Sequence, residues 1–282
     1  MPSRFAILCH GIILLLACSC GQEKNKRPPE EKDTSAVVQA YRRLSHLLDG
    51  LENLKADKCL KDASMGYLII DISGFNRMKT VAEYEPGRPL IPASTLKIFV
   101  TAASLEIFGP PVIPEVTVTD QMSVNWRSSR LLRKIGSKVY NHSSRDAGIQ
   151  AILEFWRAKG LDTRGMYLDD GNGLSRNNAI SPKHLVDALH IMTNSKYFLP
   201  FYESLPIAGH TGTLHKALKG TEAEGRVRAK TGTIAGVKSF AGYVKSSSGR
   251  ELIFAIIVNN YNCRTRLMKK KLEEILVLMA EL

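Results

Sequence analysis

Three short groups of polar residues could carry chemistry in this sequence. In the first, Ser94 and Lys97 stand three residues apart, directly after Pro92 and before an apolar run at 98–107. Because proline suits the first turn of a helix, we predict that the serine hydroxyl and the lysine amine share one helix face, one turn apart. Free backbone N–H groups at a helix N-terminus would also favour a developing oxyanion beside Ser94.

This pair suits nucleophilic catalysis by the serine with the lysine as its base. The pKa of lysine, about 10.4, would have to fall by about three, which burial and a nearby cation can impose at a cost of roughly 4 kcal/mol. The second group is Ser123-Val124-Asn125, and the third is Lys230-Thr231-Gly232 on a predicted strand. Taken alone, each group could equally be a helix cap with a surface lysine or a strand-end turn.

Strand-like segments lie near both ends of the chain, with a helical stretch between them. We expect a strand at 66–72, a weaker one before Pro86, and three more at 226–233, 238–245 and 252–259. Residues 91–219 are predicted to be mainly helical. The sequence therefore predicts an α/β domain over residues 34–282, whose sheet comes from about 60–90 and 220–282, with an inserted helical part.

A helix is expected at each end of this domain. The first should bury a face made of Val37, Tyr41, Leu44, Leu48 and Leu51. The last, 264–282, carries an apolar stripe of Met268, Leu272, Ile275, Met279 and Leu282. Lysines 269–271 beside this stripe would also suit a helix on a membrane surface, but the spacing favours a helix docked on the sheet.

The first residues predict export. Residues 1–17 contain Arg4 and an apolar run too short to span a bilayer, which is typical of a signal peptide, with an uncleaved signal anchor as the alternative. Leu15-Leu16-Ala17-Cys18 is similar to the lipobox of bacterial lipoproteins, so Cys18 is the expected lipidation site and Cys20 a weaker one. Residues 18–33 would then form a flexible tether to a periplasmic or cell-surface domain.

Composition narrows the function classes. The chain has 282 residues, 44% of them hydrophobic and 23% charged, which excludes a disordered, collagen-like or polytopic membrane protein. Its formal net charge of +12 suggests an anionic neighbour. Since export makes nucleic acid an unsuitable partner, the cell wall and the membrane surface remain as the candidate anionic neighbours. The sequence has no H-E-x-x-H, no C-x-x-C and no phosphate-binding loop, so we expect neither a metal nor a cofactor.

The order S-x-x-K, S-x-N, K-T-G is the pattern of penicillin-binding proteins and β-lactamases. Over about residues 60–282 the sequence resembles the DD-carboxypeptidase/endopeptidase family of low-molecular-mass penicillin-binding proteins. The stretches that carry the resemblance are 225–233, 236–237 and 241–243 around the third group, and the D-G-N-G-L-S-R-N-N segment at 170–178 followed by 180–182. The resemblance implies a penicillin-recognising, β-lactamase-like fold with an antiparallel sheet.

The resemblance also implies a role for each residue. Ser94 would attack the penultimate D-alanine of a peptidoglycan stem peptide, Lys97 would take its proton, and Ser123 would pass a proton to the leaving amine. Asn125 would bind the peptide amide, and Lys230 and Thr231 would hold the terminal carboxylate, with Gly232 and Thr233 as further substrate-binding residues. The backbone N–H groups of Ser94 and Thr233 would form the oxyanion hole. β-Lactams would then be covalent inhibitors.

One departure from the family is large. Only 25 residues separate Lys97 from Ser123, where the usual members carry inserted accessory domains. A non-catalytic wall-binding lipoprotein with the same fold is therefore one alternative. A β-lactamase is another, although the segment at 170–178 lacks the glutamate that a class A enzyme uses for deacylation.

The same fold would bring two cysteines near each other. Cys59 precedes the strand at 66–72 and Cys263 follows the strand at 252–259, and the resemblance makes these strands antiparallel neighbours. Both cysteines would then lie at one edge of the sheet. A disulfide between them is a possible consequence in an oxidising compartment, with two unpaired thiols as the alternative.

Overall fold

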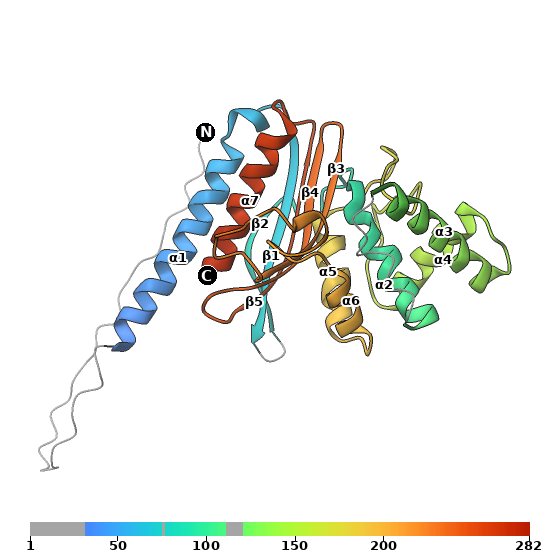
Figure 1. The fold of residues 1–282 in the computed structure, drawn as a ribbon, viewed down its shortest axis with the longest axis horizontal. Helices are drawn as coiled ribbons and strands as arrows, with labels where there is room; N and C mark the ends of the chain where they lie inside the picture. The colour runs from blue at the N-terminus through green and yellow to red at the C-terminus, as the bar shows by residue number, and fades with distance from the viewer. Residues whose placement is uncertain (1–31, 75–76, 111–120) are drawn as a thin grey trace, which may run out of the picture. The chain divides into compact units, whose positions relative to one another are not determined.

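Five antiparallel strands form one sheet in the computed structural model, which describes residues 32–74, 77–110 and 121–282. The strands are β1 (Ser64–Gly74), β2 (Arg77–Tyr84), β3 (Val227–Ile234), β4 (Val237–Lys245) and β5 (Glu251–Asn259). Their order across the sheet is β2-β1-β5-β4-β3 (Figure 1). Ser64 of β1 pairs with Asn259 of β5, so strands from the two ends of the domain meet, and the predicted fold class is confirmed.

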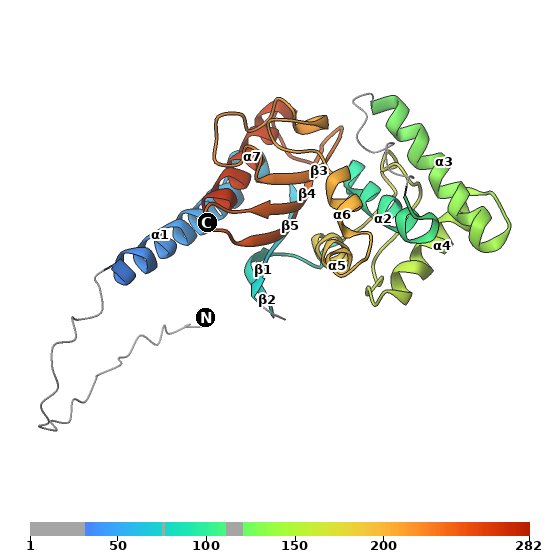
Figure 2. The same ribbon diagram turned by 60° about the horizontal axis from the view of Figure 1, so that its bottom comes forward.

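The helices divide into two sets. Between β2 and β3 in the sequence come α2 (Lys97–Phe108), α3 (Gln121–Tyr140), α4 (Arg145–Ala158), α5 (Pro182–Thr193) and α6 (Phe198–Ser204). The terminal helices are α1 (Lys32–Lys55) and α7 (Thr265–Glu281), and the short 3-10 turns are η1 (Lys58–Leu60), η2 (Ala93–Leu96) and η3 (Gly212–Leu214). Figure 2 shows α5 and α2 on the side of the sheet opposite α7. No helix of the described ranges is long and apolar enough to cross a bilayer.

The central strand β5 is buried on both faces. Ile253, Ala255 and Ile257 belong to the core shared with the helices between β2 and β3. Phe254, Ile256 and Val258 belong to the core under α7. Because successive side chains of a strand point to opposite faces, a strand covered on both sides must be apolar throughout, as this segment is.

The buried face of α7 is the predicted one, whereas the buried face of α1 differs from the prediction. The predicted stripe of α7 is buried, so its docking on the sheet is confirmed. In α1 the buried residues are Leu47, Leu51 and Leu54, whereas Tyr41 and Leu48 are exposed. The helix does begin near the predicted residue, but its buried face is turned by about one position, a rotation that spacing alone does not resolve.

Cys59 and Cys263 lie close together as free thiols in this structure, and the disulfide between them stays a prediction. The carbonyl of Cys59 accepts the N–H of Asn262 at 2.7 Å, directly beside Cys263. Burial, with a further contribution from the Cys263 thiol, raises the pKa of Cys59 to about 12. Because the thiolate is the reactive form, burial holds Cys59 in the unreactive thiol state.

Candidate active site

Ser94 and Lys97 meet through a 3-10 turn. Ser94 lies in η2, and α2 begins only at Lys97, so the α-helix starts later than Pro92 suggested. Side chains at i and i+3 eclipse each other in a 3-10 turn, which stacks the lysine on the serine. The Nζ of Lys97 donates to the Oγ of Ser94 at 2.8 Å. The contact expected from the spacing is therefore present, with a different local geometry.

Lys97 is placed where its charged form is unfavourable. Its side chain is 1% exposed. Burial, and then the positive charge of Lys230, lower the pKa of Lys97 to about 7, while the charge of Asp170 acts in the opposite direction. A pKa near neutrality is what a lysine needs in order to act as a base at physiological pH.

The backbone immediately before the serine is strained. Ala93 has a φ of 50°, in the left-handed region that disfavours residues with a Cβ. The carbonyl of Pro92 accepts two hydroxyls, Thr95 Oγ1 at 2.7 Å and Ser239 Oγ at 2.6 Å. These bonds tie the turn to β4 and hold Ser94 in a conformation that the chain alone would not favour.

The segment at 170–178 packs directly against this turn. The backbone carbonyl of Asn172 accepts a hydrogen bond from Lys97 Nζ. Gly173 has a φ of 80°, and a Cβ at this position would lie 2.0 Å from the carbonyl oxygen of Ala93. Glycine is thus required twice, by the backbone angle and by the close approach.

Two polar side chains, the half-buried Asp170 and the buried Asn178, shape that segment. The carboxylate of Asp170 accepts the N–H groups of Gly173 at 2.7 Å and Ser175 at 2.8 Å. Asn178, fully buried, donates to Asp170 Oδ1 at 2.9 Å and accepts the N–H of Asp169 at 2.8 Å. The sequence identified this segment only as a family resemblance. Its role in holding Lys97 was missed, although glycines on both sides of Asn172 were a signal of close backbone approach.

Helix α3 joins the site through the same segment. The side-chain amide of Asn172 donates to Ser129 Oγ at 2.8 Å. Asn125 stands four residues before Ser129 on the same helix, half-buried, and therefore on the same side of α3. Ser123 belongs to the first turn of α3, and its side chain lies outside the described part, as do Cys18, Cys20 and the whole of 1–31.

The third group lies on β3, as predicted, at the edge of the sheet beside η2. A Cβ on Gly232 would lie 2.7 Å from the carbonyl of Pro92, so this strand touches the turn that carries Ser94. Lys230 is buried and its Nζ donates to the carbonyl of Thr231 at 2.9 Å. Burial, and then the charge of Lys238, lower the pKa of Lys230 to about 8.

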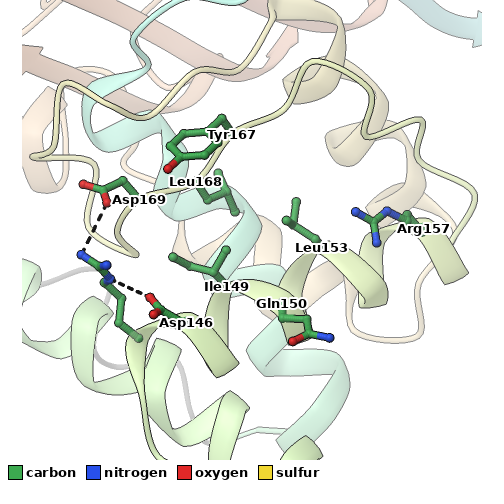
Figure 3. A pocket seen from close by; sticks show the side chains of 9 residues that line it. Asp146, Ile149, Gln150, Leu153, Arg157, Tyr167, Leu168 and Asp169 are labelled. Carbon is green, nitrogen blue, oxygen red and sulfur yellow. Dashed lines mark hydrogen bonds and ion pairs between the residues drawn. The ribbon is translucent and has the colours of Figure 1, made fainter.

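A separate groove of about 270 Å³ lies between α4 and residues 167–169 (Figure 3). Arg145 crosses one end of it, 3.0 Å from Asp146 and 3.4 Å from Asp169. None of the residues expected at the catalytic site lines this groove. Within the described ranges, no three His, Cys, Asp or Glu side chains gather as a metal site would require.

Comparisons with known proteins identify the family of the chain. Residues 111–282 match the family described as "D-Ala-D-Ala carboxypeptidase 3 (S13) family". A D-alanyl-D-alanine carboxypeptidase of Actinomadura sp. (strain R39) is 37% identical over 147 residues, which are 50% of this chain and 27% of that protein. The curated relatives are longer, and the matched part spans 27% to 36% of their lengths.

Solved structures show the same fold. Penicillin binding protein 4 (dacB) of Haemophilus influenzae, complexed with a β-lactam, superposes with a TM-score of 0.67 at 14% identity, over 84% of this chain and 98% of that chain. A β-lactamase from Sphaerobacter thermophilus superposes with a TM-score of 0.58 at 14% identity, over 83% of this chain and 95% of that chain. At these identities the likeness establishes the fold alone.

Proposed function

The chain belongs to the D-Ala-D-Ala carboxypeptidase 3 (S13) family, and from this premise we propose that it is a serine D-alanyl-D-alanine carboxypeptidase/endopeptidase. Its substrates would be peptidoglycan stem peptides, and penicillins would inhibit it covalently. The observation that carries the proposal is the 2.8 Å contact between Lys97 Nζ and Ser94 Oγ, made by an amine whose pKa is about 7.

Acylation would begin with attack of Ser94 Oγ on the carbonyl carbon of the penultimate D-alanine. Lys97, in its neutral form, accepts the hydroxyl proton as the new C–O bond forms. The backbone N–H groups of Ser94 and Thr233 stabilise the oxyanion, each worth about 3 to 4 kcal/mol in comparable enzymes. The contact of β3 with η2 supports this pairing of donors.

The leaving D-alanine must then gain a proton and depart. Ser123 passes that proton to the amine, and Asn125 holds the stem-peptide amide. Lys230 and Thr231 hold the terminal carboxylate until the acyl-enzyme has formed. Water finally hydrolyses the ester on Ser94 and releases the trimmed peptide.

The carboxylates of the site argue against a β-lactamase. Between 169 and 178 the acidic residues are Asp169 and Asp170, with no glutamate. Asp170 already accepts the N–H groups of Gly173, Leu174 and Ser175. A carboxylate used in this way is a poor base for a deacylating water, so a penicilloyl ester on Ser94 should persist.

The location of the enzyme follows from its substrate. A protein that trims peptidoglycan acts outside the cytoplasm, which agrees with the signal peptide expected at 1–17. We propose that Cys18 carries the lipid that attaches the domain to a bacterial membrane through the tether at 18–33. Metabolic labelling with a fatty-acid analogue, compared between the natural chain and Cys18→Ser, tests this attachment.

Mass spectrometry after incubation with a penicillin tests the catalytic proposal. The expected result is one penicilloyl adduct on the peptide that contains Ser94, absent from Ser94→Ala, together with release of D-alanine from a stem peptide. Rapid turnover of the penicillin without a lasting adduct would instead identify a β-lactamase. A folded protein that neither forms an adduct nor releases D-alanine would be the non-catalytic wall-binding protein.

A further inference from the structure

Helix α3 carries a large share of the positive charge of the chain. Its 20 residues include five arginines and lysines and no aspartate or glutamate. Because the whole chain has a formal net charge of +12, this one helix supplies five of those charges. In α4 and α7, by contrast, the basic and acidic residues nearly balance. The positive charge that the sequence left without a partner is therefore concentrated on one element.

Most of these basic residues lie on the side of α3 that faces solvent. Figure 2 shows α3 beyond α2, away from the sheet. Leu131, Leu132 and Ile135 are buried in the core of the helical part. The opposite side of the helix is exposed, and four of its residues form what we call the basic face: Arg130, Arg133, Lys134 and Lys138. They follow one another over about two turns of helix.

The acidic side chains of the neighbouring helix α4 are engaged elsewhere. Asp146 lies 3.0 Å from Arg145, and Glu154 accepts hydrogen bonds from Tyr140 and, at 3.0 Å, from Gln150. In the part of the chain that the structure describes, no ion pair involves a residue of the basic face. Its members stand three or four residues apart, so their like charges repel each other. An anionic partner would offset this repulsion.

The basic face borders the candidate active site. Ser129 accepts the side-chain amide of Asn172 at 2.8 Å, which joins α3 to the segment that holds the catalytic lysine. Trp126 and Arg133 stand three residues before and four after Ser129, so both are its neighbours on the helix surface. Trp126 is 63% exposed, and the guanidinium of Arg130 lies 5.3 Å from the centre of its ring. A partner bound to the basic face would therefore lie next to residues that shape the site.

We propose that the basic face of α3 binds carboxylates of neighbouring stem peptides on the same peptidoglycan strand whose stem peptide occupies the active site. The inference rests on the proposed function and names the polymer, rather than a single peptide, as the preferred form of the substrate. Stem peptides with free carboxylates repeat along the polymer, so a strand presents a row of negative charges. A strand held at the basic face raises the effective concentration of its own stem peptides at the site. A lipid surface would match the charge but would not join the two places in one molecule.

Cosedimentation with purified peptidoglycan sacculi tests the binding without turnover, using the full chain with Ser94→Ala as the parent. The variant also carries Arg130→Gln, Arg133→Gln, Lys134→Gln and Lys138→Gln. Its apparent Kd should be about tenfold weaker than that of the parent at about 0.05 M salt, and the difference should shrink at about 0.5 M, where exposed charges are screened. A matched control removes two arginines and two lysines that are exposed elsewhere and should bind within about twofold of the parent: Lys245→Gln, Arg264→Gln, Arg266→Gln and Lys270→Gln.

Activity separates the polymer from the single peptide. In a chain with Ser94 intact, the four substitutions in the basic face should slow D-alanine release from sacculi about tenfold at low salt. They should leave two reactions unchanged within about twofold: acylation by penicillin, and release from a soluble peptide that ends in D-Ala-D-Ala and carries no other carboxylate. These two reactions also show that the variant is folded.

Sacculus binding that is equal in the parent and the variant at low salt, or equally weakened in the variant and the control, would overturn the inference. So would a loss confined to vesicles of phosphatidylglycerol and phosphatidylcholine, because the partner of the basic face would then be a lipid surface. If penicillin labels Ser94 while sacculus binding is unaltered, only the inference fails. Absence of labelling and of D-alanine release contradicts the proposed function, whereas a loss of sacculus binding specific to the variant would still support the basic face as a wall-binding surface.

Discussion

The pH at which Lys97 becomes able to accept a proton should move when the charge of Lys230 is removed. Only the neutral amine can act as a base, so the rate of acylation should rise with pH through the pKa of about 7 and then level off. Lys230→Met keeps the length of the side chain but removes a cation that disfavours protonation of Lys97. The rise should therefore occur at higher pH in the variant.

The size of this displacement follows from the two causes of the lowered pKa. The difference between 10.5 and about 7 corresponds to roughly 5 kcal/mol against the charged amine, and burial is the larger cause. Because the charge of Lys230 is the smaller of the two causes, its removal should raise the pKa of Lys97 by less than burial lowers it, on the order of one pH unit. The midpoint in Lys230→Met should therefore lie near pH 8, well below the value for a solvated lysine.

The assay is the second-order rate constant for acylation by a fluorescent penicillin, measured from pH 5 to 10. Lys230→Met should also lower the absolute rate by about 10² or more, since a charge-assisted contact with the inhibitor's carboxylate is lost. The informative quantity is the midpoint of each normalised profile. Lys269→Met, which removes a partly exposed lysine elsewhere, should keep the midpoint of the natural chain. An unchanged midpoint in Lys230→Met would refute the electrostatic coupling, and a flat natural profile between pH 6 and 8 would refute Lys97 as the base.

Three further variants test the surroundings of the nucleophile. Gly173→Ala should lower the acylation rate by a factor of at least about 10², because the new Cβ would clash with the carbonyl of Ala93. The control is Gly160→Ala, which is also at positive φ but has no atom within 4 Å of the new Cβ. It should lower the unfolding free energy by only about 1 kcal/mol and leave the activity unchanged. Asn178→Ala should cost about 2 to 3 kcal/mol in urea unfolding, since it leaves buried polar groups without partners. The unfolding free energy of the natural chain should rise from pH 7 to 10, because the folded pKa of Lys97 lies below its unfolded value; Lys97→Met should remove part of that slope and raise the stability at pH 7.

The spacing of residues in the sequence was enough to predict contacts within one or two helical turns. Ser94 and Lys97 were expected to touch, and they do, because three-residue spacing brings side chains together in either an α-helix or a 3-10 turn. Spacing alone could not distinguish an α-helix from a 3-10 turn at this position. The 3-10 turn follows a strained backbone at Ala93, and that backbone is held by the hydroxyls of Thr95 and Ser239. The strands of the sheet were predictable for the same local reason, from apolar runs bounded by turns.

Contacts between distant segments were beyond such reasoning. The carbonyl of Asn172 reaches Lys97 across 75 residues, and a backbone group leaves no signature in side-chain chemistry. Lys238 pairs with Thr233 because of the register of the β3–β4 hairpin. A register shifted by one residue would have placed the two side chains on opposite faces of the sheet. The face of α1 was misplaced because Leu47 and Leu48 are adjacent, and the packing of α7 decides which of them is buried.

The buried lysines give the site a single electrostatic character. Lys97, Lys230 and Lys238 are each at most 6% exposed, and burial is the largest cause of the lowered pKa of all three. Within the described ranges their hydrogen-bond partners are hydroxyls and backbone carbonyls, and no carboxylate forms an ion pair with any of them. Burying cations without paired anions is costly for folding. In the proposed carboxypeptidase, a substrate carboxylate would add a negative charge beside these lysines and would offset part of this cost on binding.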